Sequence, residues 1–246
     1  MRFFITGGSR GIGATLVLDA VAAGHDVAFT YHTRADCARE VAERAHRLAP
    51  GCRCLAYPLD VRDPAAVEEV GESVLNDLGG LDVVVCNAGV NRPGLAATFS
   101  DEDWQEVLQT NLSGAFYVCR FFLSPFLSQR RGRFILISSV GMHGLTGQAA
   151  YCASKAGLVG LSGTLGKEYG RKGITSNVLV LGFFETDMTR EHMSDANREF
   201  WRDVCPVGRM GSPSEVAQAV LYLASDAAGF INTQVLHLTG GLDWVK

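Results

Sequence analysis

Short apolar runs alternate with longer stretches of helical periodicity along the whole chain, and this alternation limits the possible folds more than any other feature. The apolar runs are residues 3–5, 27–31, 54–57, 83–86, 134–137, 178–181 and 235–238. The helical stretches are residues 14–23, 35–48, 65–78, 103–127, 153–169 and 214–224. Strands that are apolar throughout and separated by helices indicate a parallel sheet covered on both faces. The pattern predicts a doubly wound, mostly parallel α/β sheet in a single domain spanning residues 1–246.

Charge and composition argue against several other classes of protein. The formal net charge of -4 gives no electrostatic reason to expect a nucleic-acid partner. The His and Cys residues are dispersed, so we expect no metal site, and no apolar run has the length of a membrane span. The first strand reaches a Gly-rich turn by Gly7, which leaves no room for a signal peptide. We therefore expect a cytoplasmic protein without membrane contact.

A glycine-rich turn joins the first strand to the first helix. Its glycines, Gly7, Gly11 and Gly13, are spaced Gly-x-x-x-Gly-x-Gly. Such a turn brings backbone N–H groups close to a pyrophosphate at the positive end of a helix. The predicted dinucleotide contacts in this turn are Gly7, Ser9, Arg10, Gly11, Ile12 and Gly13.

The end of the second strand is expected to lie beside the 2′ position of the cofactor ribose. An NAD site places an acid there, but this strand carries Thr30 and is followed by Arg34, with Arg10 in the turn. Arginine binds a 2′-phosphate through charge-assisted hydrogen bonds, whereas an acid would repel it. The sequence favours NADP(H) over NAD(H), with Thr30 and Arg34 among the contacts; the alternative is that both arginines are simply solvated.

A second group of residues suits acid–base chemistry. Tyr151 and Lys155 are four residues apart at the start of a predicted helix, so they share a face. A nearby ammonium favours the phenolate and lowers the pKa of a tyrosine. The strand at 134–137 ends in Ser138 and Ser139, whose hydroxyls suit a substrate oxygen at the carboxyl edge of the sheet. Asn111 lies inside a predicted helix, where asparagine is mildly unfavourable.

Together these motifs resemble the short-chain dehydrogenase/reductase family over the whole chain. In family order they are Thr6 to Gly13, Asp60-Val61, Asn87-Ala88-Gly89, Asn111, Ser138-Ser139, Tyr151 with Lys155, and Asn177. Within that family the chain is most similar to the 3-oxoacyl-acyl-carrier-protein reductases. The stretches at 147–151, 182–188, 206–211 and 234–237 carry this second likeness.

The resemblance implies a seven-stranded Rossmann sheet, a homotetramer, and hydride transfer from NADPH to a β-keto acyl thioester in fatty acid or polyketide-type biosynthesis. It implies that Tyr151 donates the proton, that Lys155 binds the ribose and tunes Tyr151, and that Asn111 supports a water-linked proton path. Ser138 would hold the substrate oxygen, because the family's serine precedes the tyrosine by thirteen residues; counting from the start of the strand selects Ser139 instead. The further cofactor contacts implied are Asp60, Val61, Asn87, Ala88, Gly89, Tyr151, Gly182 and Thr186.

Two expectations concern the periphery. Residues 182–211 have no clear period, which is typical of a lid or substrate loop. Arg130, Arg131 and Lys172 offer a docking patch for acidic acyl carrier protein, although cations near helix C-termini need no partner.

Two other functions remain open: an NADP(H)-dependent alcohol or carbonyl oxidoreductase for a free small molecule, and a non-catalytic NADP(H)-binding subunit.

Overall fold

A single parallel sheet forms the centre of the computed structural model, which describes residues 1–185 and 194–242. Its strands are β1 (Arg2–Ile5), β2 (Asp26–Tyr31), β3 (Cys54–Pro58), β4 (Val83–Cys86), β5 (Gly132–Ser139), β6 (Ile174–Leu181) and β7 (Val235–Leu238). Their order is β3-β2-β1-β4-β5-β6-β7, and each neighbouring pair is parallel. The predicted doubly wound, seven-stranded single domain is confirmed.

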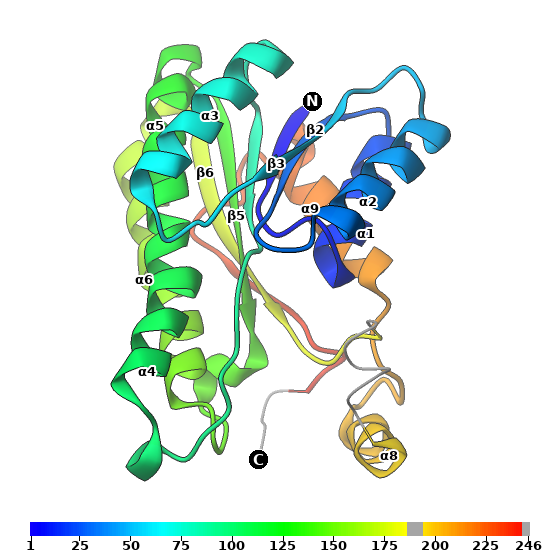
Figure 1. Ribbon diagram of the computed structural model, residues 1–246, viewed down its shortest axis with the longest axis vertical. Coiled ribbons are helices and arrows are strands. Elements are labelled where there is room, and N and C mark those ends of the chain that lie inside the picture. Colours follow the sequence, from blue (N-terminus) through cyan, green and yellow to red (C-terminus); the bar gives the residue numbers. More distant parts are fainter. Residues whose placement is uncertain (186–193, 243–246) are drawn as a thin grey trace.

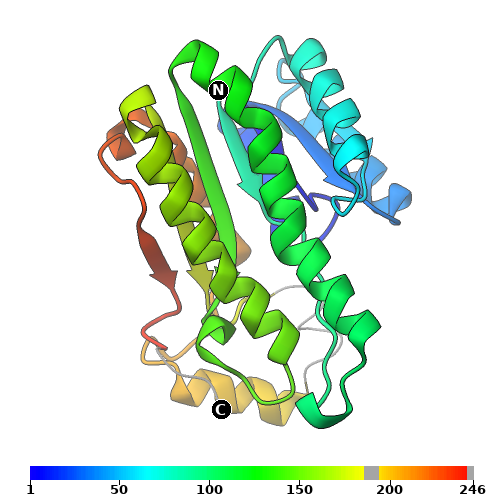
Figure 2. The same ribbon diagram turned by 90° about the vertical axis from the view of Figure 1, so that its left-hand side faces the viewer.

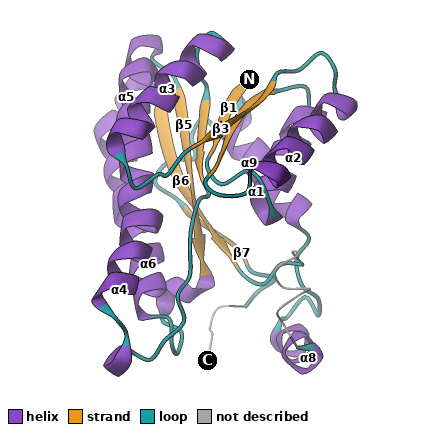
Figure 3. Cartoon of the chain, in the orientation of Figure 1, coloured by secondary structure: helices purple, strands orange, loops and turns teal. Residues whose placement is uncertain are grey.

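Helices cover both faces of the sheet (Figure 1; Figure 3). On one face lie α1 (Gly11–Ala22), α2 (Ala35–Leu48) and α9 (Pro213–Ala224). On the other lie α3 (Pro64–Leu78), α5 (Gly114–Gln129) and α6 (Ala149–Tyr169). Figure 2 shows α5 and α6 running side by side across this second face. The chain crosses from one face to the other after β3 and returns after β6, as a doubly wound fold requires.

The central residues of the strands are apolar at successive positions because they contribute to both layers. In β1, Phe3 and Ile5 belong to the core beneath α1, α2 and α9, whereas Phe4 belongs to the core on the opposite face. Successive side chains of a strand point to opposite faces, so a sheet covered on both sides needs apolar residues at odd and even positions alike. All three side chains are at most 1% exposed.

The long helix expected at 103–127 is interrupted. It consists of α4 (Asp101–Leu108), a π-helical turn (Gln109–Ser113) and α5, which continues through Pro125 to Gln129. Ser100 caps the first part by accepting a hydrogen bond from Asp103 N at 3.1 Å. The sequence pattern missed the π turn because the apolar side chains on either side of it remain buried.

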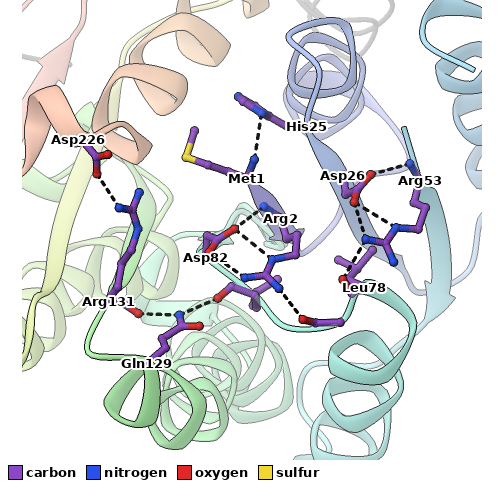
Figure 4. Close-up of polar contacts among 12 residues, drawn as sticks. Met1, Arg2, His25, Asp26, Arg53, Leu78, Asp82, Gln129, Arg131 and Asp226 are labelled. Atoms are coloured by element: carbon purple, nitrogen blue, oxygen red, sulfur yellow. Dashed lines mark hydrogen bonds and ion pairs between the residues drawn. The ribbon is translucent and has the colours of Figure 1, made fainter. Parts of the chain in front are cut away.

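Ion pairs hold the amino ends of the strands together (Figure 4). Arg2 on β1 pairs with Asp82 before β4 at 3.1 Å, and Arg53 before β3 pairs with Asp26 on β2 at 2.6 Å. Arg2 and Arg53 also donate to main-chain carbonyls at the end of α3. The amino edge of the sheet is therefore closed by structural contacts, while the carboxyl edge carries the loops that the motifs occupy.

The segment expected to form a lid is only partly described. Beyond β6 the chain pairs Phe184 with Gly211 in an isolated bridge, and α8 (Asp195–Val204) lies outside the sheet's carboxyl edge (Figure 1). Residues 186–193 lie outside the described residues, so the role of 182–211 as a lid stays a prediction. Within the described chain, no helix is long and apolar enough to cross a membrane.

Candidate active site

The Gly-rich turn between β1 and α1 has the backbone geometry that an approaching phosphate requires. Gly7 and Gly11 adopt φ values of +68° and +54°, in the left-handed region. A Cβ on Gly13 would lie 2.1 Å from the Gly7 carbonyl oxygen, so only glycine fits there. Arg10 is the N-cap of α1 but makes no side-chain capping hydrogen bond. The N–H groups of the first turn are thus left uncapped by a side chain, as an anion site at a helix N-terminus needs.

Asn87, which follows β4, fixes this turn from behind. Its Nδ2 donates to the carbonyl oxygens of Thr6 at 2.9 Å and Gly7 at 3.0 Å. The Thr6 hydroxyl in return accepts hydrogen bonds from Asn87 N and Ala88 N, both at 3.0 Å. Asn87 therefore positions the turn, and Thr6 is an equal partner in this exchange.

The structure gives Thr30 a role beyond the predicted one. Its side chain is buried behind the turn, and its hydroxyl accepts a hydrogen bond from Gly7 N at 3.3 Å. Its carbonyl oxygen accepts from Gly8 N at 2.8 Å. The Thr30 side chain thus faces the Gly-rich turn and supports it, and the expected contact of Thr30 with a cofactor stays a prediction.

The two arginines expected near the 2′-phosphate differ in their surroundings. Arg34 lies just before α2 and makes a two-pronged ion pair with Asp36, at 2.9 and 3.1 Å. This arginine keeps the pKa of Asp36 far below its ordinary value. Arg10 is exposed at the start of α1. Arg34 can reach a phosphate only by sharing or releasing its carboxylate partner.

Asp60 and Val61 follow β3 at the same edge of the sheet. The Asp60 carboxylate accepts from the Arg62 guanidinium at 2.6 and 3.0 Å, and lies 3.6 Å from Nε2 of His32. Its hydrogen bonds with Arg62 lower the pKa of Asp60 although partial burial opposes the shift. The Val61 side chain is buried against Gly114, where there is no room for a Cβ. Only the main chain of Val61 can therefore face a ligand.

Tyr151 and Lys155 share one face of the first turns of α6, as predicted. The Lys155 Nζ lies 5.7 Å from the centre of the Tyr151 ring and donates to the carbonyl oxygen of Ile137 at 2.8 Å. Burial lowers the pKa of Lys155 to about 8. Burial also raises the pKa of Tyr151, and a hydrogen bond with Ser139 partly offsets this. Ser139 is the neighbour that lowers the tyrosine pKa here, and the tuning of Tyr151 by Lys155 stays a prediction.

The two serines at the end of β5 point in different directions. Ser138 is 2% exposed, and its hydroxyl donates to the main-chain oxygen of Lys155 at 2.9 Å. Ser139 is partly exposed, and its hydroxyl lies close enough to the Tyr151 phenol to lower the pKa of that tyrosine. A Cβ on Gly141 would lie 3.5 Å from Ser139 Oγ and 3.6 Å from Cε1 of Tyr151. The structure therefore places Ser139, not the predicted Ser138, beside the phenol, because neighbouring residues of a strand face opposite ways.

Asn111 occupies the centre of the π-helical turn and is buried. Its Oδ1 accepts from Val90 N at 2.8 Å, and its Nδ2 donates to Val90 O at 2.9 Å and to Ser154 Oγ at 3.0 Å. The side chain thus ties the loop after β4 to α6. A Cβ on Gly89 would lie 3.2 Å from Asn111 Oδ1 and 3.6 Å from Lys155 Nζ, so Gly89 keeps this corner open.

The carboxyl ends of β6 and β7 form the far wall of the site. Gly182 N donates to Leu238 O at 3.0 Å, and a Cβ on Gly182 would meet Thr239 at 2.9 Å. The Phe183 and Trp201 rings stack with centroids 3.9 Å apart. Beneath α8 they line a mainly apolar cavity of about 180 Å³, together with Phe184, Val207, Met210 and Leu242. The expected contact Thr186 lies outside the described residues.

The predicted docking patch lies at the opposite edge of the sheet. Arg130 and Arg131 precede β5, and Lys172 precedes β6, whereas Ser139 ends β5. Arg131 pairs with Asp226 at 2.7 Å (Figure 4). The eight residues of β5 separate this patch from the catalytic edge by about 23 Å at ~3.3 Å per residue. The structure does not bring these cations to the catalytic site of the same chain.

Three contacts of the site were missed by sequence reasoning. Thr6 belongs to the recognised turn, but its hydroxyl was assigned no role. Arg62 and His32 carry no motif, and only their places just beyond the ends of β3 and β2 mark them. Within the described residues, no group of three His, Cys, Asp or Glu side chains is arranged to hold a metal.

Comparisons with known proteins agree with this geometry. The sequence profile of the family described as Enoyl-(Acyl carrier protein) reductase matches residues 7–243. The chain is 39% identical to the 3-oxoacyl-[acyl-carrier-protein] reductase FabG of Escherichia coli K12 over 97% of its own length and 95% of the relative's. It is 37% identical to Nodulation protein G of a Rhizobium species, over 98% and 96% of the two chains.

A solved structure shares the whole fold. A short-chain dehydrogenase/reductase of Serratia marcescens, solved as a double mutant, superposes with a TM-score of 0.91 at 31% identity, covering 99% of this chain and 98% of that one. The chain thus matches its relatives over nearly its full length, and it carries the Gly-rich turn, the parallel sheet and the cluster of Ser139, Tyr151 and Lys155. This protein is an oxidoreductase and belongs to the short-chain dehydrogenase/reductase family.

Proposed function

We propose that this oxidoreductase uses NADPH to reduce the 3-oxo group of an acyl thioester to the 3-hydroxyacyl form. The observation that carries the proposal is the pair of hydroxyl groups of Ser139 and Tyr151, brought together beside Lys155 at the carboxyl edge of the sheet. Two donors aimed at one place suit a carbonyl oxygen that gains negative charge during reduction. Relatives named as 3-oxoacyl-[acyl-carrier-protein] reductases supply the substrate class.

The residues present fit a phosphorylated dinucleotide. The uncapped start of α1 and the space that Gly13 leaves free suit a pyrophosphate, and Arg10 adds a cation near the second strand. We assign main-chain contacts to Gly7, Ser9, Gly11, Ile12, Val61, Ala88, Gly89 and Gly182, and a ribose contact to Lys155. NADPH held by these residues would supply the hydride for a new C–H bond at C3 of the substrate.

The proton comes from the protein. The substrate oxygen lies between Ser139 Oγ and the Tyr151 hydroxyl, and as C3 accepts the hydride, the oxygen takes the Tyr151 proton and becomes a hydroxyl. Because burial raises the pKa of Tyr151, this side chain is protonated at neutral pH and ready to act as an acid. The ketone, NADPH and one proton thus yield the alcohol and NADP⁺.

Reprotonation of Tyr151 requires a route for protons. Lys155 is the nearest cation, and its Nζ lies beside the same glycine as Asn111 Oδ1. The Asn111 side chain makes three hydrogen bonds, two with the main chain of Val90 and one with Ser154. The main chain at Asn111, and not its side chain, therefore takes part in the proposed proton path. A π-helical turn interrupts the regular i→i−4 bonding and leaves room for a water at a main-chain carbonyl.

We further propose that the acyl group arrives on acyl carrier protein, in fatty acid or polyketide-type biosynthesis, and that the enzyme is a homotetramer. Arg130 and Lys172 suit an acidic partner. Since this patch lies at the amino edge, a carrier docked there serves the active site of a neighbouring subunit. Arg131 contributes less, because Asp226 neutralises it.

NADPH oxidation with two acetoacetyl thioesters tests the proposal, one on acyl carrier protein and one on a pantetheine mimic. We expect turnover with both, a preference for the carrier, and loss of turnover in Tyr151→Phe. Crotonyl thioester, with a C=C bond in place of the ketone, should not react. A turnover confined to crotonyl thioester would contradict ketone reduction, and a turnover confined to free ketones or alcohols would favour the free small-molecule alternative.

A further inference from the structure

His32 occupies a position that decides which cofactor a fold of this kind accepts. It is the first residue beyond β2, at the carboxyl edge, where an acid in NAD-binding chains receives the ribose 2′-hydroxyl. Two residues earlier, Thr30 holds the Gly-rich turn through its hydrogen bonds with Gly7 N and Gly8 N. The register of β2 with β3 pairs Tyr31 with Pro58, and Tyr31 O accepts from Leu59 N at 2.8 Å. His32 therefore lies between the phosphate-binding turn and Asp60.

The imidazole of His32 is exposed to solvent and contacts Asp60 on one side, so a ligand can reach it. Its side chain is 59% exposed, and its Nε2 lies 3.6 Å from Oδ2 of Asp60. The same oxygen accepts from Arg62 at 2.6 Å. Asp60 thus restricts the ring's position, and Arg62 balances the charge of the carboxylate.

The charges around His32 nearly cancel, so the charge of His32 itself strongly affects the net charge of this edge. Asp60 and Arg62, from the β3–α3 connection, sum to zero, and so do Arg34 and Asp36 at the start of α2. Arg10 in the turn after β1 adds one positive charge. With His32 neutral this edge carries a net charge of +1, and with His32 protonated it carries +2.

We propose that His32 is the residue that distinguishes NADP(H) from NAD(H), its protonated imidazole donating a charge-assisted hydrogen bond to the 2′-phosphate. This inference rests on the proposed use of a phosphorylated cofactor. A 2′-hydroxyl offers no charge to the imidazolium, whereas a 2′-phosphate does. Histidine is also the side chain whose charge ordinarily changes between pH 5 and 8. The preference for NADPH over NADH therefore depends on pH in the physiological range.

The direction of that dependence follows from proton linkage. Protonated His32 binds the phosphate better than neutral His32, so binding of NADPH takes up protons and the affinity gained through His32 falls as the pH rises. Asp60 stays ionised throughout this range because Arg62 holds its pKa below the ordinary value. The phosphate titrates in the parent protein and in its variants alike, so parent and variant are compared at the same pH.

Dissociation constants of NADPH and NADH, measured by cofactor fluorescence, provide the test. At about pH 6, where histidine ordinarily carries its proton, His32→Gln should weaken NADPH binding about five- to tenfold. At about pH 8.5, where histidine is ordinarily neutral, the two proteins should differ less than about twofold. NADH binding should be unchanged at either pH. The matched control is His46→Gln, an exposed histidine at the other end of α2, which should behave as the parent.

A second variant separates charge from structure. His32→Arg carries a permanent charge at the same place, so its preference for NADPH should remain high at both pH values. Calorimetry in buffers of different ionisation enthalpy should detect proton uptake on NADPH binding to the parent but not to His32→Gln or His32→Arg. Equal weakening of NADH and NADPH in His32→Gln, or parallel pH profiles of parent and variant, would overturn the assignment of His32. Failure of the parent to bind NADPH at all would instead contradict the proposed function.

Discussion

Ser139 and Tyr151 lie together beside Gly141, where a Cβ would contact both the serine hydroxyl and the phenol ring. Ser138, one residue earlier, faces the interior and bonds to the main chain of Lys155. Tyr151 follows Ser139 by twelve residues, one fewer than the family spacing used to select Ser138. The position of Ser139 beside the phenol agrees with the count from the start of the strand, which selects Ser139.

Substitution of the two serines should separate their roles. Ser139→Ala removes a donor to the developing oxyanion, so kcat should fall about 10²–10³-fold with little change in the Kd for NADPH. Ser138→Ala is the matched control. It should keep kcat within a few-fold and lower the free energy of unfolding by about 1 kcal/mol, because the lost hydrogen bond is buried. Steady-state kinetics and urea unfolding measure both effects; a large fall in kcat for Ser138→Ala alone would restore the original prediction.

Lys155 should limit stability as well as support catalysis. Its pKa is lowered from 10.5 to about 8 by burial, so the folded protein releases this proton more readily than the unfolded chain. Stability should therefore rise as the pH increases from about 8 to 10.5, since the unfolded state binds more protons in that range. The full effect is about 3 kcal/mol.

Lys155→Met removes the buried charge while keeping a chain of similar length. We expect this variant to lose turnover, to be more stable than the parent at pH 7, and to lack the rise in stability at alkaline pH. Thermal unfolding between pH 7 and 10 measures the difference. A variant less stable than its parent at neutral pH would show that the hydrogen bond to Ile137 O outweighs the cost of burying the ammonium.

Thr30 should affect both nicotinamide cofactors alike. Thr30→Val keeps the shape of the side chain but removes the acceptor for Gly7 N, so the protein should lose about 1 kcal/mol of stability. Because the Gly-rich turn serves the pyrophosphate common to both cofactors, the Kd values for NADPH and NADH should rise by the same factor. A loss confined to NADPH would place the hydroxyl on the 2′-phosphate after all.

Lys172 should matter only when the substrate is carried on a protein. Lys172→Glu should raise the KM for acetoacetyl-acyl carrier protein about fivefold and leave the KM for the pantetheine mimic unchanged. Arg44→Glu, a charge reversal on the exposed face of α2, is the control of equal charge. An equal effect of the two substitutions would indicate a general influence of net charge and would argue against a specific docking patch.

Docking in trans gives a further expectation. Oligomers that contain both Tyr151→Phe and Lys172→Glu chains should turn over acetoacetyl-acyl carrier protein with the KM of the parent, because the intact patch of one subunit serves the intact site of another. Oligomers of Tyr151→Phe alone should be inactive, and oligomers of Lys172→Glu alone should keep the raised KM. Absence of complementation in mixed oligomers, confirmed by mass spectrometry, would contradict the proposal that the patch serves a neighbouring site.

The sequence predicted what depends on spacing and periodicity. The sheet followed from apolar runs that must be buried on both faces, and Tyr151 with Lys155 followed from their separation on one helix. It could not predict what depends on the direction of a single side chain. Ser138 and Ser139 are chemically alike, and only the register of β5 with its neighbours decides which of them faces Tyr151.

Local competition among polar groups is equally invisible in the sequence. Arg34 looked available to a phosphate, but Asp36, two residues away, holds its guanidinium in a two-pronged ion pair. Thr30 looked accessible at the end of a strand, but the Gly-rich turn lies over it. A lone histidine after a strand carries no motif, so only the contact of His32 with Asp60 marks this residue. In each case the three-dimensional neighbour decides the role.

The π-helical turn at Gln109–Ser113 makes the site sensitive to residue number as well as residue type. A π-helical turn holds about one residue more than an α-helical turn, so it takes up an extra residue while the helices on either side of it keep their phase. Removing one residue here should restore regular α-helix and leave Phe122 and Phe126 in the core, but it should take away the wide turn that aligns Asn111 with Val90 and Ser154. A single deletion in this segment should therefore spare the fold and damage the site, because the extra residue serves the placement of Asn111 and not the packing of the helix.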